Sequence, residues 1–391
     1  MATTIPCFAR RERFSAAWPL GAGTALLCRF PLFERKGLRR TVAMGTSCFT
    51  SLPQIAVVHV ATIIPFVSSA VPTRYCCRMK LGIVVEGQMG LTYAQQRAIA
   101  TRAESLGFDA FYRTDHYESF PGPEDQATSD AWSVLAGLAR ETRSIALGTL
   151  VSPVTFRLPG QYAKVVATVQ EMAGRRMHAG LGAGWHESEH RRHGFPFPDM
   201  PVRAAMLEEQ LSIVRGLWSG PDGWSFDGAH YQVRDALFRP KPDPVPWIIT
   251  GGEGSPRGMR IAAAHADEFN LTSSTPQIAR EKFVALDDAC RAAGRDPATL
   301  VRSAMTGLLV GRSQAEHLAG VTRLMARIGG SGDPEAYLAP RRPRWVSGTP
   351  DEALTQMRAF RDAGAQRLLL QHFLPLELEP LDLLAELRDA I

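Results

Sequence analysis

From Met79 onward the sequence predicts an α/β protein that folds as a closed (β/α)8 barrel, a TIM barrel, with insertions. Strand and helix patterns alternate strictly along this part of the chain, and such units form parallel sheets with right-handed crossovers. Eight strand patterns fall within residues 79–391, which is the number that closes a barrel. A doubly wound open sheet is the alternative. Gly82, Gly87 and Gly90 do not fit the G-x-G-x-x-G fingerprint that this alternative requires after its first strand.

Short apolar runs define the expected strands, and segments with helical spacing between them define the expected helices. In chain order, the strands are Leu81–Val85, Ala110–Thr114, Ser144–Leu150, Met177–Leu181, Trp247–Thr250, Glu268–Leu271, Ser303–Val310 and Arg367–Gln371. The helices are Tyr93–Ser105, Ser129–Arg140, Gln161–Met172, Val202–Trp218, Pro256–His265, Ile278–Ala293, Ala315–Ile328, Pro350–Ala363 and Pro380–Asp389. Gly107 can stop the first helix, and Ser129 or Asp130 can cap the second. A two-stranded excursion is expected at Trp224–Phe238, with a turn at Asp227-Gly228.

Charge and cysteine content divide the chain near Met79. Residues 1–78 carry ten Lys or Arg against two Glu, a balance of +8, so the remaining residues carry 34 basic and 37 acidic side chains, a balance of −3. The later part therefore lacks the basic surplus typical of nucleic-acid-binding proteins. Five of the six cysteines precede Met79, and only Cys290 follows it. We expect no disulfide framework and no cysteine zinc site, as in the reduced cytoplasm.

Residues 1–78 show neither sustained helical periodicity nor clean strand alternation, and three interpretations stay open. They could be a targeting leader, because Arg10-Arg11 precedes the apolar stretch Ala16–Leu27. The apolar run Ile55–Val71 is about long enough to span a membrane, although it contains a histidine and a proline. We favour the third interpretation, in which residues 1–78 are a disordered extension or a mis-assigned start, and residues 79–391 are the working domain. No membrane association is expected of residues 79–391.

The functional side chains of such a barrel lie just past the carboxyl ends of its strands. The residues at these places are Glu86, Asp115-His116, Thr149 to Ser152, Gly182 to Trp185, Gly251 to Glu253, and Asn270. This set is polar, rich in glycine and partly aromatic, which suits a flat cofactor that carries a phosphate.

Alternating glycines end the fourth strand, at Gly180, Gly182 and Gly184, and Trp185 follows directly. Because glycine has no Cβ, its backbone can approach a planar ring closely. The alternative is a tight strand-to-helix turn that needs positive φ values.

A second glycine-rich turn, Gly251-Gly252-Glu253-Gly254, precedes a helix that Ser255 can cap. Backbone N–H groups at such a turn form an anion site, helped by the helix dipole. We therefore expect Gly251 and Gly252 to hold a phosphate.

Two histidine patterns stand out. His116 ends the second strand beside Asp115. Because histidine titrates near neutrality, His116 is a candidate for proton transfer; a structural histidine at a strand end is the alternative.

The stretch His186 to His190 matches H-x-x-E-H, the pattern of inverted zinc peptidases. No downstream helix offers a convincing third ligand, so we expect no metal. We interpret this stretch as a helix beside the cofactor, with Trp185 and Glu189 nearest the pocket.

Five segments in order resemble the bacterial luciferase-like monooxygenase superfamily, in particular its branch of oxidoreductases that use the deazaflavin coenzyme F-420. These segments are Phe108 to His116, Leu147 to Pro159, Arg176 to His190, Pro246 to Gly254, and Asp267 to Asn270. The resemblance runs from about Met79 to the C-terminus.

The resemblance implies a luciferase-like barrel that transfers a hydride between coenzyme F-420 and a small organic substrate. It implies that His116, in the Thr114-Asp115-His116 context, lies against the deazaflavin ring, and that the turn at Gly251 takes the cofactor phosphate. It also implies an unusual cis peptide within Thr149 to Ser152, for which Leu150-Val151 is the candidate and Ser152-Pro153 the alternative.

The expected site can now be stated in full. The catalytic candidates are His116, Trp185 and Glu189, and the cofactor-binding candidates are Asp115, Thr149, Leu150, Val151, Ser152, Gly182, Gly184, Gly251, Gly252 and Glu253. One alternative function is an FMN-dependent two-component monooxygenase that takes reduced flavin from a reductase partner and reacts with O2. Another is a non-catalytic flavin-binding barrel. The resemblance further implies homodimers, whereas the substrate is not evident from the sequence.

Overall fold

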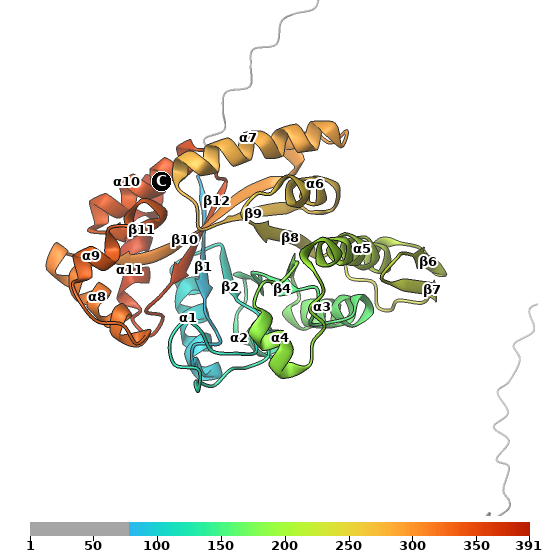
Figure 1. The fold of residues 1–391 in the computed structure, drawn as a ribbon, viewed down its shortest axis with the longest axis horizontal. Helices are drawn as coiled ribbons and strands as arrows, with labels where there is room; N and C mark the ends of the chain where they lie inside the picture. Colours follow the sequence, from blue (N-terminus) through green and yellow to red (C-terminus); the bar gives the residue numbers. More distant parts are fainter. Residues whose placement is uncertain (1–77) are drawn as a thin grey trace, which may run out of the picture. The chain divides into compact units, whose positions relative to one another are not determined.

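Eight parallel strands close on themselves in the computed structural model, which describes residues 78–391 (Figure 1). The predictions for the leader, the apolar run and the remainder of residues 1–77 lie outside the described residues. The barrel strands, in spatial order, are β1 (Lys80–Val85), β2 (Ala110–Arg113), β3 (Ala146–Thr149), β5 (His178–Gly182), β8 (Trp247–Gly252), β9 (Glu268–Thr272), β10 (Val301–Val310) and β12 (Arg367–His372). Strand β12 pairs in parallel with β1 and closes the barrel. The predicted (β/α)8 barrel is therefore confirmed.

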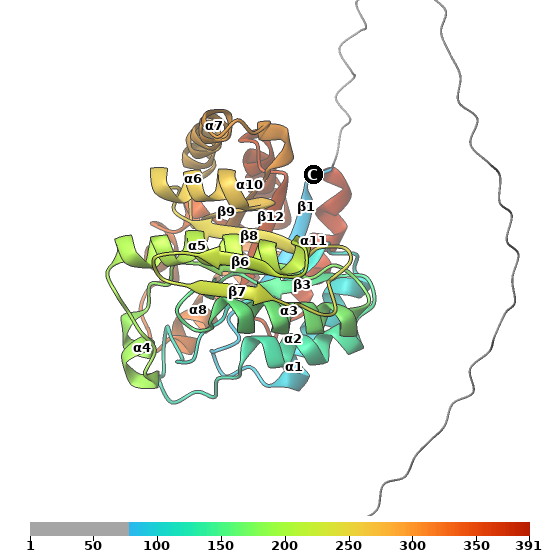
Figure 2. The same cartoon turned by 90° about the vertical axis from the view of Figure 1, so that its right-hand side faces the viewer.

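Helices surround the barrel, as the two perpendicular views show (Figures 1 and 2). They are α1 (Tyr93–Ser105), α2 (Ala131–Glu141), α3 (Pro159–Ala173), α4 (Glu187–His193), α5 (Met200–Ser219), α6 (Pro256–His265), α7 (Pro276–Ala292), α8 (Gln314–Arg327), α9 (Pro334–Leu338), α10 (Pro350–Asp362) and α11 (Glu379–Leu387). Polar side chains fix several of their starts. The Asp130 carboxylate accepts a hydrogen bond from the N–H of Ser133 at the start of α2, and the Ser255 hydroxyl accepts one from Gly258 at the start of α6.

The strands alternate between two apolar layers. In β1, Leu81 and Ile83 pack outward into the large core between barrel and helices, whereas Val84 belongs to a smaller cluster inside the barrel. In β2, Phe111 likewise packs outward and Tyr112 inward. This period of two is what parallel strands buried on both faces require.

The predicted excursion is a two-stranded antiparallel sheet of β6 (Trp224–Asp227) and β7 (Gln232–Ala236). It follows α5 and projects beside that helix (Figure 1). The Glu209 carboxylate of α5 accepts hydrogen bonds from the backbone N–H groups of Ala229 and Tyr231, which attaches the hairpin loop to the helix.

The sequence did not predict three short elements: β4 (Ser152–Pro153), α9 and β11 (Trp345–Gly348). Strand β11 pairs with the end of β10, at Gly307 to Val310. Because β12 already pairs with Gly307 and Leu308 along one edge of β10, β11 must occupy the other edge, beyond the end of β9. The barrel wall is thus extended by a strand that has no βα unit of its own.

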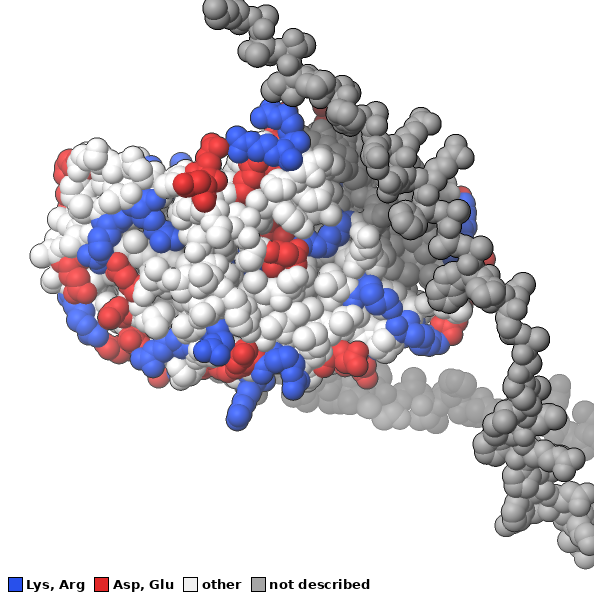
Figure 3. Space-filling model, turned by 90° about the horizontal axis from the view of Figure 1, so that it is seen from below, with Lys and Arg blue, Asp and Glu red and all other residues white. Residues whose placement is uncertain are grey.

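Within residues 78–391, no helix is both long enough and apolar enough to cross a membrane. On the face of the molecule that Figure 3 shows, Lys and Arg side chains alternate with Asp and Glu. This face therefore lacks a broad field of one sign.

Candidate active site

The imidazole of His116 and the carboxylate of Glu189 form the centre of the candidate site. His116 follows the carboxyl end of β2, and Glu189 lies in the first turn of α4. Nδ1 of His116 lies 2.9 Å from Oε1 of Glu189, and Oε2 of Glu189 accepts a 2.9 Å hydrogen bond from the backbone N–H of Tyr117. Burial would raise the pKa of Glu189, but the hydrogen bonds from His116 and Tyr117 lower it below its ordinary value. Glu189 is therefore a buried carboxylate that accepts from both donors.

This hydrogen bond fixes the tautomer of His116. A carboxylate can only accept, so Nδ1 carries the hydrogen and Nε2 of the neutral ring carries a lone pair. Within residues 78–391, no side chain or backbone group forms a hydrogen bond with Nε2. Nε2 is therefore available to take a proton from a bound molecule.

Aromatic rings border His116. Phe120 meets it edge to face with ring centroids 4.6 Å apart, and Trp185 does so at 5.9 Å. Gly184, with a φ of 79°, makes the turn after β5 that brings Trp185 to this position. The Trp185 side chain is 64% exposed. A large indole left open beside a histidine offers an apolar surface that a flat ligand can cover.

The side chains of Asp115, Ser152 and Thr149 are buried. Asp115 is 1% exposed, and its Oδ2 lies 2.6 Å from the Ser152 hydroxyl and 2.5 Å from the Arg157 guanidinium. The Thr149 hydroxyl donates to the carbonyl of Gly180. All three side chains form hydrogen bonds within the protein and so hold strand ends together, and their role in cofactor binding stays a prediction.

The cis peptide bond predicted in this region lies between Leu150 and Val151, and Ser152-Pro153 is not cis. The side chains of Leu150 and Val151 belong to the apolar cluster inside the barrel, Leu150 buried and Val151 partly buried. The two residues thus form an apolar floor at the carboxyl end of the barrel.

Glycines on two neighbouring strands make room for this floor. A Cβ on Gly182 would lie 2.7 Å from Cγ2 of Val151, and a Cβ on Gly251 would lie 3.4 Å from its Cγ1. A Cβ on Gly180 would lie 2.0 Å from the carbonyl oxygen of Thr149. These glycines therefore permit the close approach of the protein's own bulge after β3, and their contact with a cofactor ring stays a prediction.

The second glycine turn differs in detail from the prediction. Strand β8 continues through Gly252, two residues beyond its predicted end, because Gly251 and Gly252 still pair with β9. The residue with positive φ is Gly254, at 74°. A Cβ added to Gly252 would have no atom within 4 Å, so open space lies beside its backbone, close in sequence to the start of α6. The Glu253 side chain is exposed.

The H-x-x-E-H pattern does not form a zinc site. His190 is 0% exposed, its Nδ1 lies 2.7 Å from the carbonyl oxygen of His186, and its Nε2 lies 2.6 Å from the Thr155 hydroxyl. Burial lowers the pKa of His190, so the ring is neutral and its two nitrogen atoms are engaged. Nowhere among residues 78–391 do three His, Cys, Asp or Glu side chains converge as metal ligands would. The helix that carries the pattern instead supplies Glu189.

Sequence reasoning missed Arg157 and the partners of Glu86 at this end of the barrel. Arg157 binds Asp115 and also Asp130 of the α2 cap, at 2.5 Å each; burial would lower the pKa of Arg157, but Asp115 raises it. Glu86, the residue after β1, accepts hydrogen bonds from Gln88 at 2.6 Å and from Gln371 of β12. Only the strand-end position of Glu86 was visible in the sequence, because its partner Gln371 lies 285 residues away.

Comparison with known proteins gives consistent results. Residues 79–367 match the family model described as luciferase-like monooxygenase. An F-420-dependent glucose-6-phosphate dehydrogenase of Amycolatopsis mediterranei (strain U-32) is 28% identical over 291 residues, which cover 69% of this chain and 86% of that protein.

Among solved structures, an F-420-dependent secondary alcohol dehydrogenase in complex with an F-420-acetone adduct superposes with a TM-score of 0.69 and 20% identity, covering 79% of this chain and 98% of that one. The EDTA monooxygenase of Chelativorans sp. BNC1 superposes with a TM-score of 0.67 and 18% identity, covering 80% of this chain and 94% of that one. At these identities the two structures establish a shared fold.

Proposed function

The chain belongs to the luciferase-like monooxygenase family, whose oxidoreductases depend on F-420 or flavin, and we propose a specific reaction for it. In this reaction, the protein transfers a hydride between coenzyme F-420 and a small organic substrate. The sequence relative that is 28% identical acts with F-420, and this relationship supports the choice of cofactor. A substrate with a hydroxyl that becomes a carbonyl fits the available proton acceptor best.

The observation that carries the proposal is the oriented His116. Its Nδ1 donates a hydrogen bond to the buried carboxylate of Glu189. Its Nε2 forms no hydrogen bond within residues 78–391. Removal of a hydride from a carbinol carbon requires that the hydroxyl proton leave as well, and a neutral imidazole with its lone pair at Nε2 can accept it. In the reverse direction the protonated imidazole returns the proton to the carbonyl oxygen, while Glu189 stabilises its positive charge.

The residues at the carboxyl end of the barrel fit a flat cofactor that carries a phosphate. Val151 and Leu150 provide an apolar floor, and the exposed Trp185 provides a further apolar surface. A Cβ at Gly252 would enter open space near the N-terminus of α6, where backbone N–H groups and the helix dipole favour an anion. The three apolar side chains would hold the ring, and the turn at Gly252 would hold the phosphate.

The bound deazaflavin would supply the hydride acceptor and donor at its C5 position. The chain itself positions the substrate and manages one proton. Glu189 holds the His116 ring, and Phe120 packs edge to face against that ring. A non-catalytic flavin-binding barrel would have no need for a histidine oriented by a buried carboxylate.

We also propose that residues 79–391 form the catalytic domain of a cytoplasmic enzyme. Within residues 78–391 the one cysteine is Cys290, which is buried and free, as expected in a reduced compartment. A chain that begins at Met79 should express, fold and bind cofactor like the full chain, and loss of soluble protein on this truncation would contradict the domain assignment. The homodimer and the reductase partner stay predictions.

The cofactor is tested by titrating the full chain with F-420 and, separately, with FMN, and by following the quenching of ligand fluorescence. Tighter binding of F-420 is expected. A clear preference for FMN would instead assign the chain to the two-component monooxygenases and refute the proposal.

A further inference from the structure

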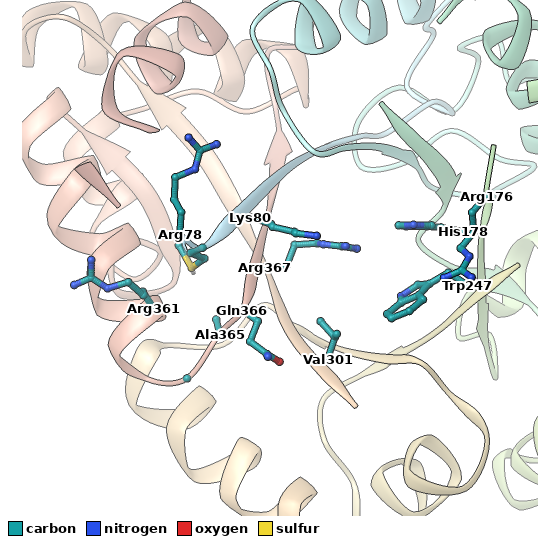
Figure 4. Close-up of a pocket in the computed structure, with 12 residues that line it drawn as sticks. Arg78, Lys80, Arg176, His178, Trp247, Val301, Arg361, Ala365, Gln366 and Arg367 are labelled. Carbon is teal, nitrogen blue, oxygen red and sulfur yellow. The ribbon is translucent and has the colours of Figure 1, made fainter. Parts of the chain in front are cut away.

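A second cavity lies at the amino end of the barrel, opposite the candidate active site. Its volume is about 610 Å³, and it is lined by the first residues of five barrel strands, Lys80, His178, Trp247, Val301 and Arg367 (Figure 4). None of the residues proposed for catalysis or for cofactor binding lines it. A cavity of this size is in the range of small-molecule sites.

Cationic side chains enter this cavity from two sides. In Figure 4, Lys80 and Arg367 extend toward His178 and Trp247, and Arg176 lies on the far side next to the Trp247 ring, with its guanidinium carbon 5.8 Å from the ring centroid. The other two cations of the lining point away from this group, and each has a local acidic partner: Arg78 pairs with Asp389 at 2.6 Å and Arg361 with Asp362 at 2.9 Å.

Acidic side chains compensate only one of the three converging cations. Arg367 donates to Glu268 at 2.7 Å and to the Tyr112 hydroxyl at 2.9 Å, so the charges of Arg367 and Glu268 cancel. Lys80 and Arg176 form no ion pair with any acidic side chain of residues 78–391. Lys80 and Arg176 are therefore two converging cations without an ion pair, whereas the carboxylates of Glu268 and Asp109 both act on Arg367.

One of its donors is also buried without a partner. The Arg367 side chain is 9% exposed, and its Nε–H forms no hydrogen bond in residues 78–391. A buried guanidinium N–H without an acceptor is costly, and a ligand that accepts from it removes this cost.

His178 cannot contribute a compensating charge of either sign. Its Nδ1 lies 2.5 Å from the Tyr112 hydroxyl, and burial together with Arg367, Arg176 and Lys80 lowers the pKa of His178 well below its ordinary value. The ring is therefore neutral and surrounded by positive potential, with an aromatic neighbour in Trp247.

We propose that this cavity is a second ligand site, which binds a small phosphate-bearing dianion separately from the cofactor. Lys80 and Arg176 neutralise the two charges of the ligand, and the Arg367 Nε–H donates to one of its oxygen atoms. Such a ligand lies at the end of the barrel where it touches neither His116 nor the cofactor ring, so it acts on the stability of the barrel and not on the chemistry.

The test uses inorganic phosphate as the probe and the full chain without cofactor, studied by isothermal titration calorimetry at constant ionic strength. Lys80→Gln and Arg176→Gln should each weaken phosphate binding about tenfold, because each removes one charge-assisted contact. Both side chains are exposed and both variants should keep the melting temperature of the wild type without phosphate.

Two matched variants separate this site from other sources of binding. Arg280→Gln removes an exposed cation of α7 that forms no ion pair within residues 78–391, and it should leave the affinity unchanged. Gly252→Ala, at the other end of the barrel, removes only phosphate binding at the turn proposed for the cofactor, so the binding that Lys80→Gln and Arg176→Gln weaken should persist in it. The proposal is overturned if the wild type shows no saturable binding, if Lys80→Gln and Arg176→Gln bind like Arg280→Gln, or if Gly252→Ala alone abolishes binding.

Discussion

Replacing Glu189 by Gln tests the orientation of His116 without removing a single heavy atom from the site. The carboxylate accepts two hydrogen bonds, one from Nδ1 of His116 and one from the N–H of Tyr117, each at 2.9 Å. Glutamine offers one acceptor and one NH2 group in the same place. The NH2 group must therefore face either the N–H of Tyr117 or Nδ1 of His116.

The size of the effect follows from these two choices. If the amide oxygen stays on His116, the N–H of Tyr117 loses its acceptor in a partly buried position, which costs about 1–3 kcal/mol. If the oxygen turns to Tyr117, the NH2 group meets Nδ1, and the ring hydrogen must move to Nε2. The second choice keeps both hydrogen bonds of the residue at position 189, one with the N–H of Tyr117 and one with Nδ1, so we expect it to dominate. Turnover should then fall by about 10²–10⁴, the usual contribution of a positioned base, because Nε2 no longer has a lone pair.

The tautomer is read directly from the ¹⁵N shifts of the His116 imidazole in the full chain, with no need for a known substrate. The wild type should carry its hydrogen on Nδ1, and Glu189→Gln should carry it on Nε2. Glu187→Gln, two residues earlier on the exposed side of α4, is the control and should resemble the wild type. An unchanged tautomer together with unchanged turnover in Glu189→Gln would refute the reasoning.

The same variant has a predicted dependence on pH. Because the folded pKa of Glu189 lies below the ordinary value of 4.5, its ionisation stabilises the fold at higher pH, and this stabilisation is lost as the pH falls through the folded pKa. The difference in melting temperature between wild type and Glu189→Gln should therefore shrink on acidification from neutrality to below 4.5. A difference that grows on acidification would contradict the assignment of a buried carboxylate.

Three further substitutions test separate parts of the account. His116→Asn keeps a donor for Glu189 but cannot take up a proton, so it should retain the melting temperature within a few degrees and lower turnover by about 10²–10⁴; full activity would return His116 to a structural role. Gly252→Ala should weaken cofactor binding by about 1–3 kcal/mol in a fluorescence titration, with little change in stability because its Cβ meets no protein atom within 4 Å; unchanged affinity would place the phosphate elsewhere. Gly182→Ala puts a Cβ 2.7 Å from Val151 and should destabilise the fold by about 1–3 kcal/mol in chemical denaturation, whereas the double variant with Val151→Ala should recover stability; a single variant as stable as the wild type would contradict the close packing.

The architecture followed from local patterns, whereas several details depended on contacts that local patterns do not record. Helix α6 has the limits predicted from Ser255 and Pro256, because its cap and first turn are formed by neighbouring residues. Strand β8 is longer than predicted because Gly251 and Gly252, poor strand formers, are held by pairing with β9. Strand β11 is too short to show a period, and its place depends on the free edge of β10.

In the candidate site, too, the sequence predicts the positions of residues but not the contacts between them. His116 and Trp185 were found from their positions after strand ends, and Glu189 from the helix that follows β5. That Glu189 binds His116, 73 residues away in the chain, is a tertiary fact. Asp115 and His116 both lie past the end of β2, but Asp115 turns toward Arg157 and His116 toward Glu189. A strand-end rule cannot separate these two neighbours.

The central claim is that the cofactor binds beside His116 at the carboxyl end of the barrel, and one titration tests it most directly. The imidazole resonances of the ¹⁵N-histidine-labelled full chain are followed while F-420 is added to saturation. We predict that the Nε2 resonance of His116 shifts, while those of His178, at the amino end of the barrel, do not move. A saturating titration that leaves His116 unmoved, or that shifts His178 instead, would contradict the account.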